Sequence, residues 1–139
     1  MILLDTNVIS EPLRRAPDRR VIDWIDSQPL ETLYLSAITV AELRAGVALL
    51  PAGKRREDLH ESLERQVLPL FIGRVLPFDL AATQAYADLM AKARAAGAAI
   101  AAADGFIAAI AAAQGLIVAT RDTSPFDAAA LTVINPWQS

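Results

Sequence analysis

The stretch Ile2-Leu3-Leu4-Asp5-Thr6-Asn7 sets the pattern that decides the fold, because a short, wholly apolar run is typical of a strand buried on both faces. Asp5 ends the run, and a carboxylate in that place is expensive to desolvate unless a cation or a hydrogen-bond donor meets it. Three more acids, Glu42, Asp104 and Asp122, occur in similarly apolar settings. With one histidine and no cysteine in the chain, these acids indicate a hard-cation site built from oxygen ligands.

Apolar runs and helical patterns alternate along the rest of the chain. Besides residues 2–4, short strands are expected at 33–35, 75–76, 116–119 and 131–134. Helices are expected after the capping residues Asp18, Ser36 and Asp79, and at 54–68 and 102–113, with a turn and a loop between residues 6 and 17. This alternation predicts an α/β fold with a parallel sheet covered by helices on both faces.

The four acids are expected to meet at one edge of that sheet, because ligands of parallel sheets gather at the carboxyl ends of the strands. Asp5 and Asp122 directly follow strands, while Glu42 and Asp104 lie early in helices that begin at the same edge. Carboxylates that converge repel one another strongly, and a bound metal ion relieves that repulsion. The arrangement therefore favours a metal site.

Each acid also has a purely structural explanation. Asp5 and Asp122 could form turns after their strands, and Glu42 could be a solvated helix residue. Asp104 could stabilise a helix N-terminus, although it is the only charged residue in a long apolar stretch. Their shared placement at one sheet edge favours the metal site over four separate coincidences.

The composition limits the class of protein. A length of 139 residues predicts a single domain, residues 1–139, with one core. The net charge of −3 argues against a general surface for polyanions, although neutralising the four acids would leave the remainder mildly basic. The absence of cysteine excludes disulfides and thiolate metal sites and is compatible with the reducing cytoplasm.

Neither apolar segment of the chain has the pattern of a targeting or membrane segment. The N-terminal run has no basic region before it and is broken by Asp5, so it does not resemble a signal peptide. The alanine-rich stretch 95–113 contains Asp104 and two glycines and is only weakly hydrophobic. We therefore expect a soluble protein with no membrane partner.

Other catalytic motifs are missing. His60 has no second histidine with which to bind zinc, and no G-x-S-x-G or phosphate-binding loop is present. The basic residues of two short segments are ordinarily solvated but could contact phosphates: Lys54, Arg55 and Arg56, and Arg14, Arg15, Arg19 and Arg20.

The order and context of the four acids resemble those of the PIN-domain ribonucleases. The matching segments are Asp5-Thr6-Asn7, Thr39-Val40-Ala41-Glu42-Leu43, the run 101–109 around Asp104, and Thr120-Arg121-Asp122 with Phe126 after it. The match runs from Met1 to Trp137 and is similar to the VapC toxins of type II toxin–antitoxin pairs, in particular to their FitB-like members.

The resemblance implies a three-layer α/β/α sandwich around a parallel five-stranded sheet, and a homodimer. It implies Mg²⁺ or Mn²⁺ held by Asp5, Glu42, Asp104 and Asp122, with Thr6 and Thr120 at hydroxyl positions near the metal. One departure is Pro125, where many relatives have an acid before the phenylalanine. The partners it implies are RNA as substrate, a VapB-like or FitA-like antitoxin and, through the antitoxin, promoter DNA.

Three functions are compatible with this pattern. The leading hypothesis is an endoribonuclease that uses Mg²⁺-activated water, with Asp5 and Asp104 as principal ligands and Glu42 and Asp122 at a second metal or at the water. An alternative is a weakly active or inactive scaffold that binds an antitoxin and acts in a complex on promoter DNA. A phospho-acceptor receiver domain would need a second acid beside the first and a lysine after the last strand, and the only lysines are Lys54 and Lys92.

Overall fold

The computed structural model describes residues 1–138 and contains a five-stranded sheet in the order β3-β2-β1-β4-β5, with every pairing parallel. The strands are β1 (Ile2–Leu4), β2 (Leu33–Ser36), β3 (Val75–Leu76), β4 (Ile117–Ala119) and β5 (Val133–Ile134). All five strands follow the predicted pattern, and β1 occupies the centre, where both of its faces are covered.

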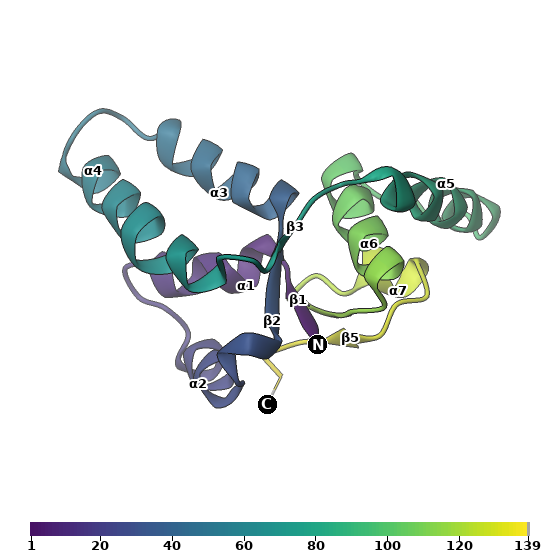
Figure 1. Ribbon diagram of the computed structural model, residues 1–139, viewed down its shortest axis with the longest axis horizontal. Helices are drawn as coiled ribbons and strands as arrows, with labels where there is room; N and C mark the ends of the chain where they lie inside the picture. The colour runs from purple at the N-terminus through teal and green to yellow at the C-terminus, as the bar shows by residue number, and fades with distance from the viewer. Residues whose placement is uncertain (139) are drawn as a thin grey trace.

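Helices cover both faces of the sheet (Figure 1). On one side are α1 (Thr6–Ser10), α2 (Arg19–Ser27), α3 (Ala37–Ala48) and α4 (Lys54–Glu61); on the other are α5 (Leu80–Ala95), α6 (Ala102–Gln114) and α7 (Ser124–Ala128). The side chains of β1 alternate between the two layers, since Ile2 and Leu4 join the first core and Leu3 joins the second. The predicted three-layer α/β/α sandwich is confirmed.

The predicted helix caps are present. The side chains of Asp18, Ser36 and Asp79 accept hydrogen bonds from the backbone N–H groups of Arg20, Thr39 and Ala82, and so satisfy donors that the first helical turn leaves free. Gly115 ends α6 in the left-handed conformation, with φ 66°.

The expected turn and loop between residues 6 and 17 are partly wrong, because Thr6–Ser10 form α1 and Glu11–Leu13 form a 3-10 turn, η1. Asp5 caps α1 by accepting from the Thr6 N–H, and burial of Val8 and Ile9 stabilises a helix too short to persist alone.

The short helix α7, after the Thr120–Asp122 turn, was also not expected. The charged helix expected at 54–68 is present as α4, which continues through a π-helical segment, Ser62–Val67, into a 3-10 turn, Leu68–Phe71. A further 3-10 turn, η2, spans Leu30–Thr32.

The alanine-rich stretch that raised the question of a membrane segment is divided between α5 and α6 by a turn at Gly97, whose φ is 73°. Across residues 1–138, no helix is both long enough and apolar enough to cross a membrane.

Gly105 lets α6 approach α5 closely beside Asp104. A Cβ at Gly105 would lie 3.1 Å from Tyr86 Cε1 and 3.4 Å from Met90 Sδ. The Tyr86 ring is stacked on Phe106, with ring centroids 4.9 Å apart, so it is not free to move away. The first turn of α6, which carries Asp104, therefore depends on a glycine at this position.

Gly105→Ala should destabilise the protein, whereas Gly46→Ala should stabilise it. Both gain roughly 0.5–1 kcal/mol of helix propensity, but only the Cβ at Gly105 is overpacked against Tyr86, at a cost of roughly 1–3 kcal/mol. Gly46 is the matched control, since no atom lies within 4 Å of its added Cβ. Urea unfolding measures both, and equal shifts for the two variants would show that the packing beside Asp104 is loose.

Candidate metal centre

Asp5 lies at the carboxyl end of β1 and is buried, with 5% of its surface exposed. Its Oδ1 accepts from the Thr6 N–H at 2.8 Å. Its Oδ2 accepts from the Thr120 hydroxyl at 2.8 Å and from Asn7 Nδ2 at 3.4 Å. These bonds hold the carboxylate in one orientation at the edge of the sheet where the predicted site lies.

Thr120 joins this carboxylate to the turn that carries Asp122. The fully buried Thr120 hydroxyl follows β4 and accepts from the Asp122 N–H at 3.2 Å while it donates to Asp5. Asp122 itself is exposed. The neighbouring strands β1 and β4 thus bring together two acids that are far apart in the sequence.

Glu42 is attached to the same edge through Thr6. The Thr6 hydroxyl donates to Glu42 Oε1 at 2.7 Å and lies 3.0 Å from Thr39 Oγ1. The expectation that Glu42 and Asp122 occupy apolar settings is wrong, since both are exposed. The outer face of α3 is apolar in composition but points to solvent, and only tertiary packing determines which face of such a helix is covered.

The charges of the four acids reach one another. The pKa of Asp5 is raised first by burial and further by the charges of Asp104 and Glu42, against the lowering effect of the hydrogen bonds from Thr120 and Thr6. The pKa of the half-buried Asp104 is raised by burial and then by the charges of Asp122 and Glu42. The carboxylates therefore form one electrostatic cluster at the predicted edge.

No basic side chain neutralises this cluster, since every ion pair found in residues 1–138 involves other acids. Within the same residues, no group of three or more Asp, Glu or His side chains is arranged so that it could hold a metal ion. An open set of carboxylate oxygens fits Mg²⁺ or Mn²⁺, because Mg²⁺ usually keeps several waters and takes only one or two protein carboxylates together with substrate phosphate.

Asn7 and Thr39 also belong to the site. Both lie within the matched sequence motifs, but neither was predicted as a site residue. Asn7 Nδ2 lies 3.4 Å from Asp5 Oδ2 and 3.3 Å from Thr120 Oγ1, so the amide links the two strands that carry the site. Thr39 precedes Glu42 by three residues on α3, a spacing that places both side chains on one helix face and could have identified it.

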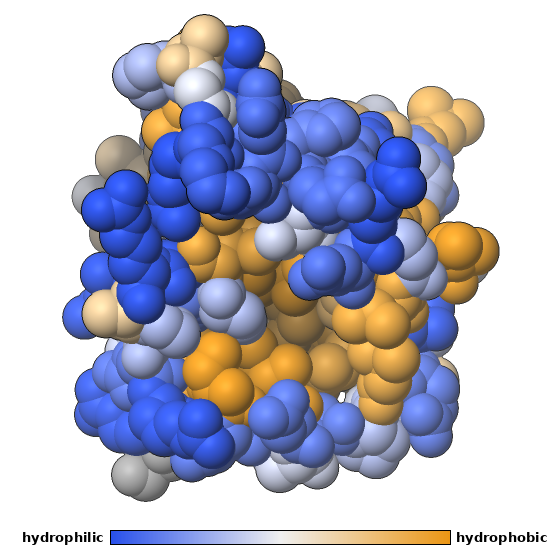
Figure 2. Space-filling view, turned by 90° about the vertical axis from the view of Figure 1, so that its left-hand side faces the viewer, coloured by the Kyte–Doolittle hydropathy of each residue, from blue (hydrophilic) through white to orange (hydrophobic). Residues whose placement is uncertain are grey.

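A groove of about 290 Å³ adjoins the cluster. Its lining includes Thr6 and Glu42 at the site, Leu43 and Val47 of α3, and Arg14. Figure 2 shows that this side of the molecule is hollowed, with apolar side chains inside a polar rim. A larger hollow of about 620 Å³ lies between α3 and α4 and contains none of the four acids, so we do not assign the chemistry to it.

Thr120→Val should destabilise the protein by roughly 1–3 kcal/mol at neutral pH, because it leaves the buried Asp5 carboxylate short of a donor. The Thr120 hydrogen bond favours ionised Asp5 in the native state only, so its removal raises the native pKa further. The loss should therefore grow as pH rises through the pKa of Asp5.

Urea unfolding at acidic and neutral pH measures this dependence. Thr132→Val, at an exposed position, is the control and should change little at either pH. An equal loss for Thr120→Val at both pH values would show that its hydroxyl does not serve the Asp5 carboxylate.

A family model and two similar proteins relate the chain to known proteins. A model of the PIN domain matches residues 2–131. The chain is 67% identical over 139 residues to the plasmid stability protein StbB of Pseudomonas syringae pv. tomato, with 100% of both chains covered. It is 64% identical over 138 residues to the VapC ribonuclease Y4jK of Sinorhizobium fredii, with 99% of both covered.

Two solved structures are similar to this chain over its whole length. FitAcB from Neisseria gonorrhoeae superposes with a TM-score of 0.97 at 60% identity, covering 100% of both chains. FitAB bound to an IR36 DNA fragment gives the same TM-score at 57% identity, covering 100% of this chain and 97% of the other.

Proposed function

The chain belongs to the PIN-domain family, among the VapC-type toxins, and from that premise we propose that it is a metal-dependent endoribonuclease of a toxin–antitoxin pair. The substrate is RNA, and the bond hydrolysed is an internal phosphodiester. The observation that carries the proposal is the cluster of mutually interacting carboxylates, led by Asp5 and Asp104, to which no basic side chain of residues 1–138 is paired.

We propose a role for each acid of the cluster. Asp5 and Asp104, which have raised pKa values, are the principal ligands for Mg²⁺ or Mn²⁺. Glu42 and Asp122 are more exposed and hold a second cation or position the attacking water. When bound, the cation supplies a more acidic water and neutralises charge on the phosphate.

The hydroxyl groups act as positioning residues. Thr120 holds the Asp5 carboxylate and, through the Asp122 N–H, the backbone of the turn that carries Asp122. Thr6 holds the Glu42 carboxylate towards the cluster by donating to Oε1. Such fixed carboxylates need little rearrangement when charge develops on the phosphate.

RNA cleavage by protein purified free of antitoxin tests the proposal. Fragments should appear with Mg²⁺ or Mn²⁺, disappear with EDTA, and return when Mg²⁺ is restored in excess. RNA that stays intact under all these conditions would reject the nuclease and leave a binding function.

That binding function is the second candidate: a weakly active scaffold that holds an antitoxin and acts with it on promoter DNA. It is favoured by the groove beside the site and by the likeness to FitAB, a structure that contains a DNA fragment. Metal-dependent cleavage that a ligand substitution removes would separate the nuclease from this scaffold. In either case the antitoxin is expected to resemble VapB or FitA, and the protein to act in the cytoplasm.

We also propose that the protein is a homodimer. The likeness to the VapC-type toxins supports this assembly, and large exposed apolar side chains such as Leu49 at 84%, Leu80 at 86% and Ile72 at 79% are available to an interface. Light scattering gives the molar mass, and 14.9 kDa at micromolar concentration would indicate a monomer instead.

A further inference from the structure

Arg121, in the turn that carries Asp122, is held by three contacts. Its guanidinium carbon lies 5.2 Å from the centroid of the Trp137 ring, and Trp137 is almost fully buried. Its backbone N–H donates to Asn7 Oδ1 at 3.2 Å, and its carbonyl accepts from Asn135 at 3.5 Å. The guanidinium group is therefore fixed on an aromatic face while the residue stays exposed.

The position of Arg121 is coupled directly to the site. Asn7, which fixes the Arg121 backbone, also donates to Asp5 and to Thr120. Arg121 precedes Asp122 in the chain, yet it forms no ion pair with any acid among the residues that the structure describes. The Arg121 side chain thus follows directly from the turn that carries Asp122, and its charge is available to a ligand.

Arg20 and Arg14 pair with two acids, Asp18 and Glu11, and the charge of Arg121 reaches Asp18. Arg20 forms an ion pair with Asp18 at 2.8 Å, and the pKa of Asp18 is lowered first by its hydrogen bonds with Arg20 and also by the charge of Arg121. The buried Glu11 carboxylate joins the group, since it accepts from Arg14 at 2.8 Å and from the Asp18 N–H at 3.4 Å.

This group contains three arginines and two carboxylates, which leaves an excess of positive charge in a protein whose net charge is −3. Arg14 also lines the groove that contains Thr6 and Glu42. One arginine of the group thus follows β4, and another lines the groove beside Glu42.

We propose that Arg121, with Arg14 and Arg20, binds backbone phosphates of the RNA strand that flank the scissile bond. The inference rests on the proposed nuclease function and adds the contacts that hold the substrate. An acidic site repels a polyanion, so affinity must come from basic groups next to it. The planar arginine fork suits phosphate, and a guanidinium already stacked on Trp137 loses little freedom on binding.

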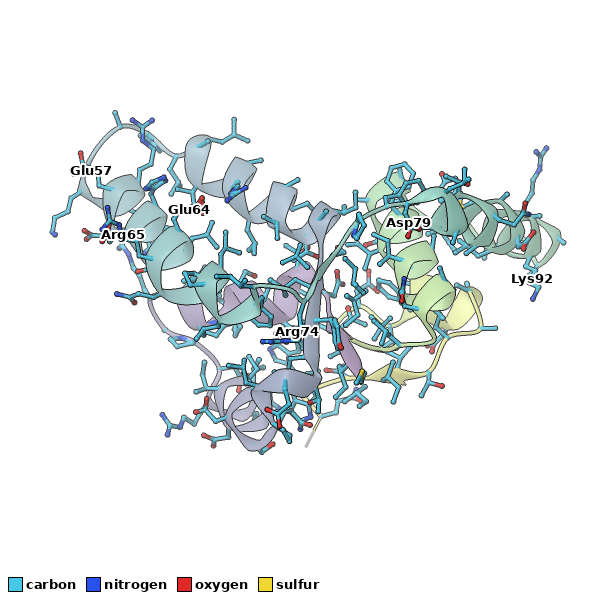
Figure 3. The ribbon with its side chains drawn as sticks, viewed as in Figure 1. Glu57, Glu64, Arg65, Arg74, Asp79 and Lys92 are labelled. Carbon is cyan, nitrogen blue, oxygen red and sulfur yellow. The ribbon has the colours of Figure 1, made fainter. Side chains whose placement is uncertain are left out.

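Binding of a fluorescent single-stranded RNA to protein carrying Asp104→Asn, which keeps the RNA uncut, tests the inference. Adding Arg121→Ala should weaken binding roughly tenfold, as expected for loss of a charged hydrogen bond. It should also lower the slope of log affinity against log salt by about 0.7, which corresponds to one phosphate contact on a single strand. Lys92→Ala, a cation at the far end of α5, is the control and should leave binding unchanged (Figure 3).

Asp18→Asn should have the opposite effect. Asparagine still caps α2, but it no longer forms the ion pair with Arg20, so RNA binding should tighten by about twofold or more. A merely structural arginine cluster would not give this gain, because removing an ion pair would leave binding unchanged or weaker.

The outcomes separate this inference from the function on which it rests. Parent protein that binds no RNA would reject both. Parent protein that binds RNA while Arg121→Ala and Lys92→Ala behave alike would reject the arginine contact alone. If Arg121→Ala kept RNA binding but weakened binding of poly-glutamate, the group would be a docking surface for an acidic protein, and our assignment would be overturned.

Discussion

Asp104→Asn should abolish metal-dependent RNA cleavage while the protein remains folded. The change removes one charged ligand and almost no volume, so the packing of α6 against α5 should persist. Substitutions of groups that merely support metal ligands typically cost 10–100-fold, so loss of a principal ligand should reduce the rate by about 100-fold or more. The initial rate of RNA cleavage at saturating Mg²⁺ measures this effect.

Asp88→Asn is the matched control, because Asp88 is an exposed acid on α5 that bonds only to Gln84 among the residues described. It should retain full activity. Equal cleavage rates for wild type and Asp104→Asn would mean that the activity lies outside the acid cluster.

Mg²⁺ should raise the melting temperature of wild type, and much less that of Asp104→Asn. A ligand that binds only the native state at 100 times its dissociation constant contributes about 2.7 kcal/mol, which for a domain of this size is roughly ten degrees. Thermal melts at several Mg²⁺ concentrations near neutral pH measure the shift.

The stability of the metal-free protein should change with pH in a definite direction. Asp5 and Asp104 have native pKa values raised above their unfolded ones, so their contribution to stability is complete below the unfolded values and is lost as pH rises through the native ones. Asp104→Asn removes one of these destabilising charges and should stabilise the metal-free protein at neutral pH.

The same gain is not expected for Asp5→Asn, because the Asp5 carboxylate accepts bonds from Thr120 and Asn7 that an amide nitrogen cannot accept. A wild-type melt that ignores Mg²⁺, together with a destabilised Asp104→Asn, would indicate that the acids serve only as caps and turns.

The sequence was sufficient to predict the five strands and the longer helices, because the strands are short apolar runs and several helices begin at an Asp or Ser that satisfies free N–H groups. It also indicated the edge at which the acids meet, since the carboxyl ends of parallel strands lie at the same edge of the sheet. The roles of Asp5, Glu42, Asp104 and Asp122 as metal ligands stay a proposal.

Features that depend on tertiary contacts were not predictable. Helix α1 is only five residues long and persists because Val8 and Ile9 are buried, which no local pattern shows. The exposure of Glu42 depends on which face of α3 the core covers. The approach of Arg121 to Asp18 joins segments about a hundred residues apart, and spacing along the chain gives no sign of it.

Anomalous diffraction from crystals soaked in Mn²⁺ tests the metal centre most directly, because it locates the cation without reference to activity. We expect an anomalous peak in contact with carboxylate oxygens of Asp5 and Asp104, with Glu42 or Asp122 close by, and loss of that peak in Asp104→Asn. A peak elsewhere, or no peak at a Mn²⁺ concentration that supports cleavage, would contradict it.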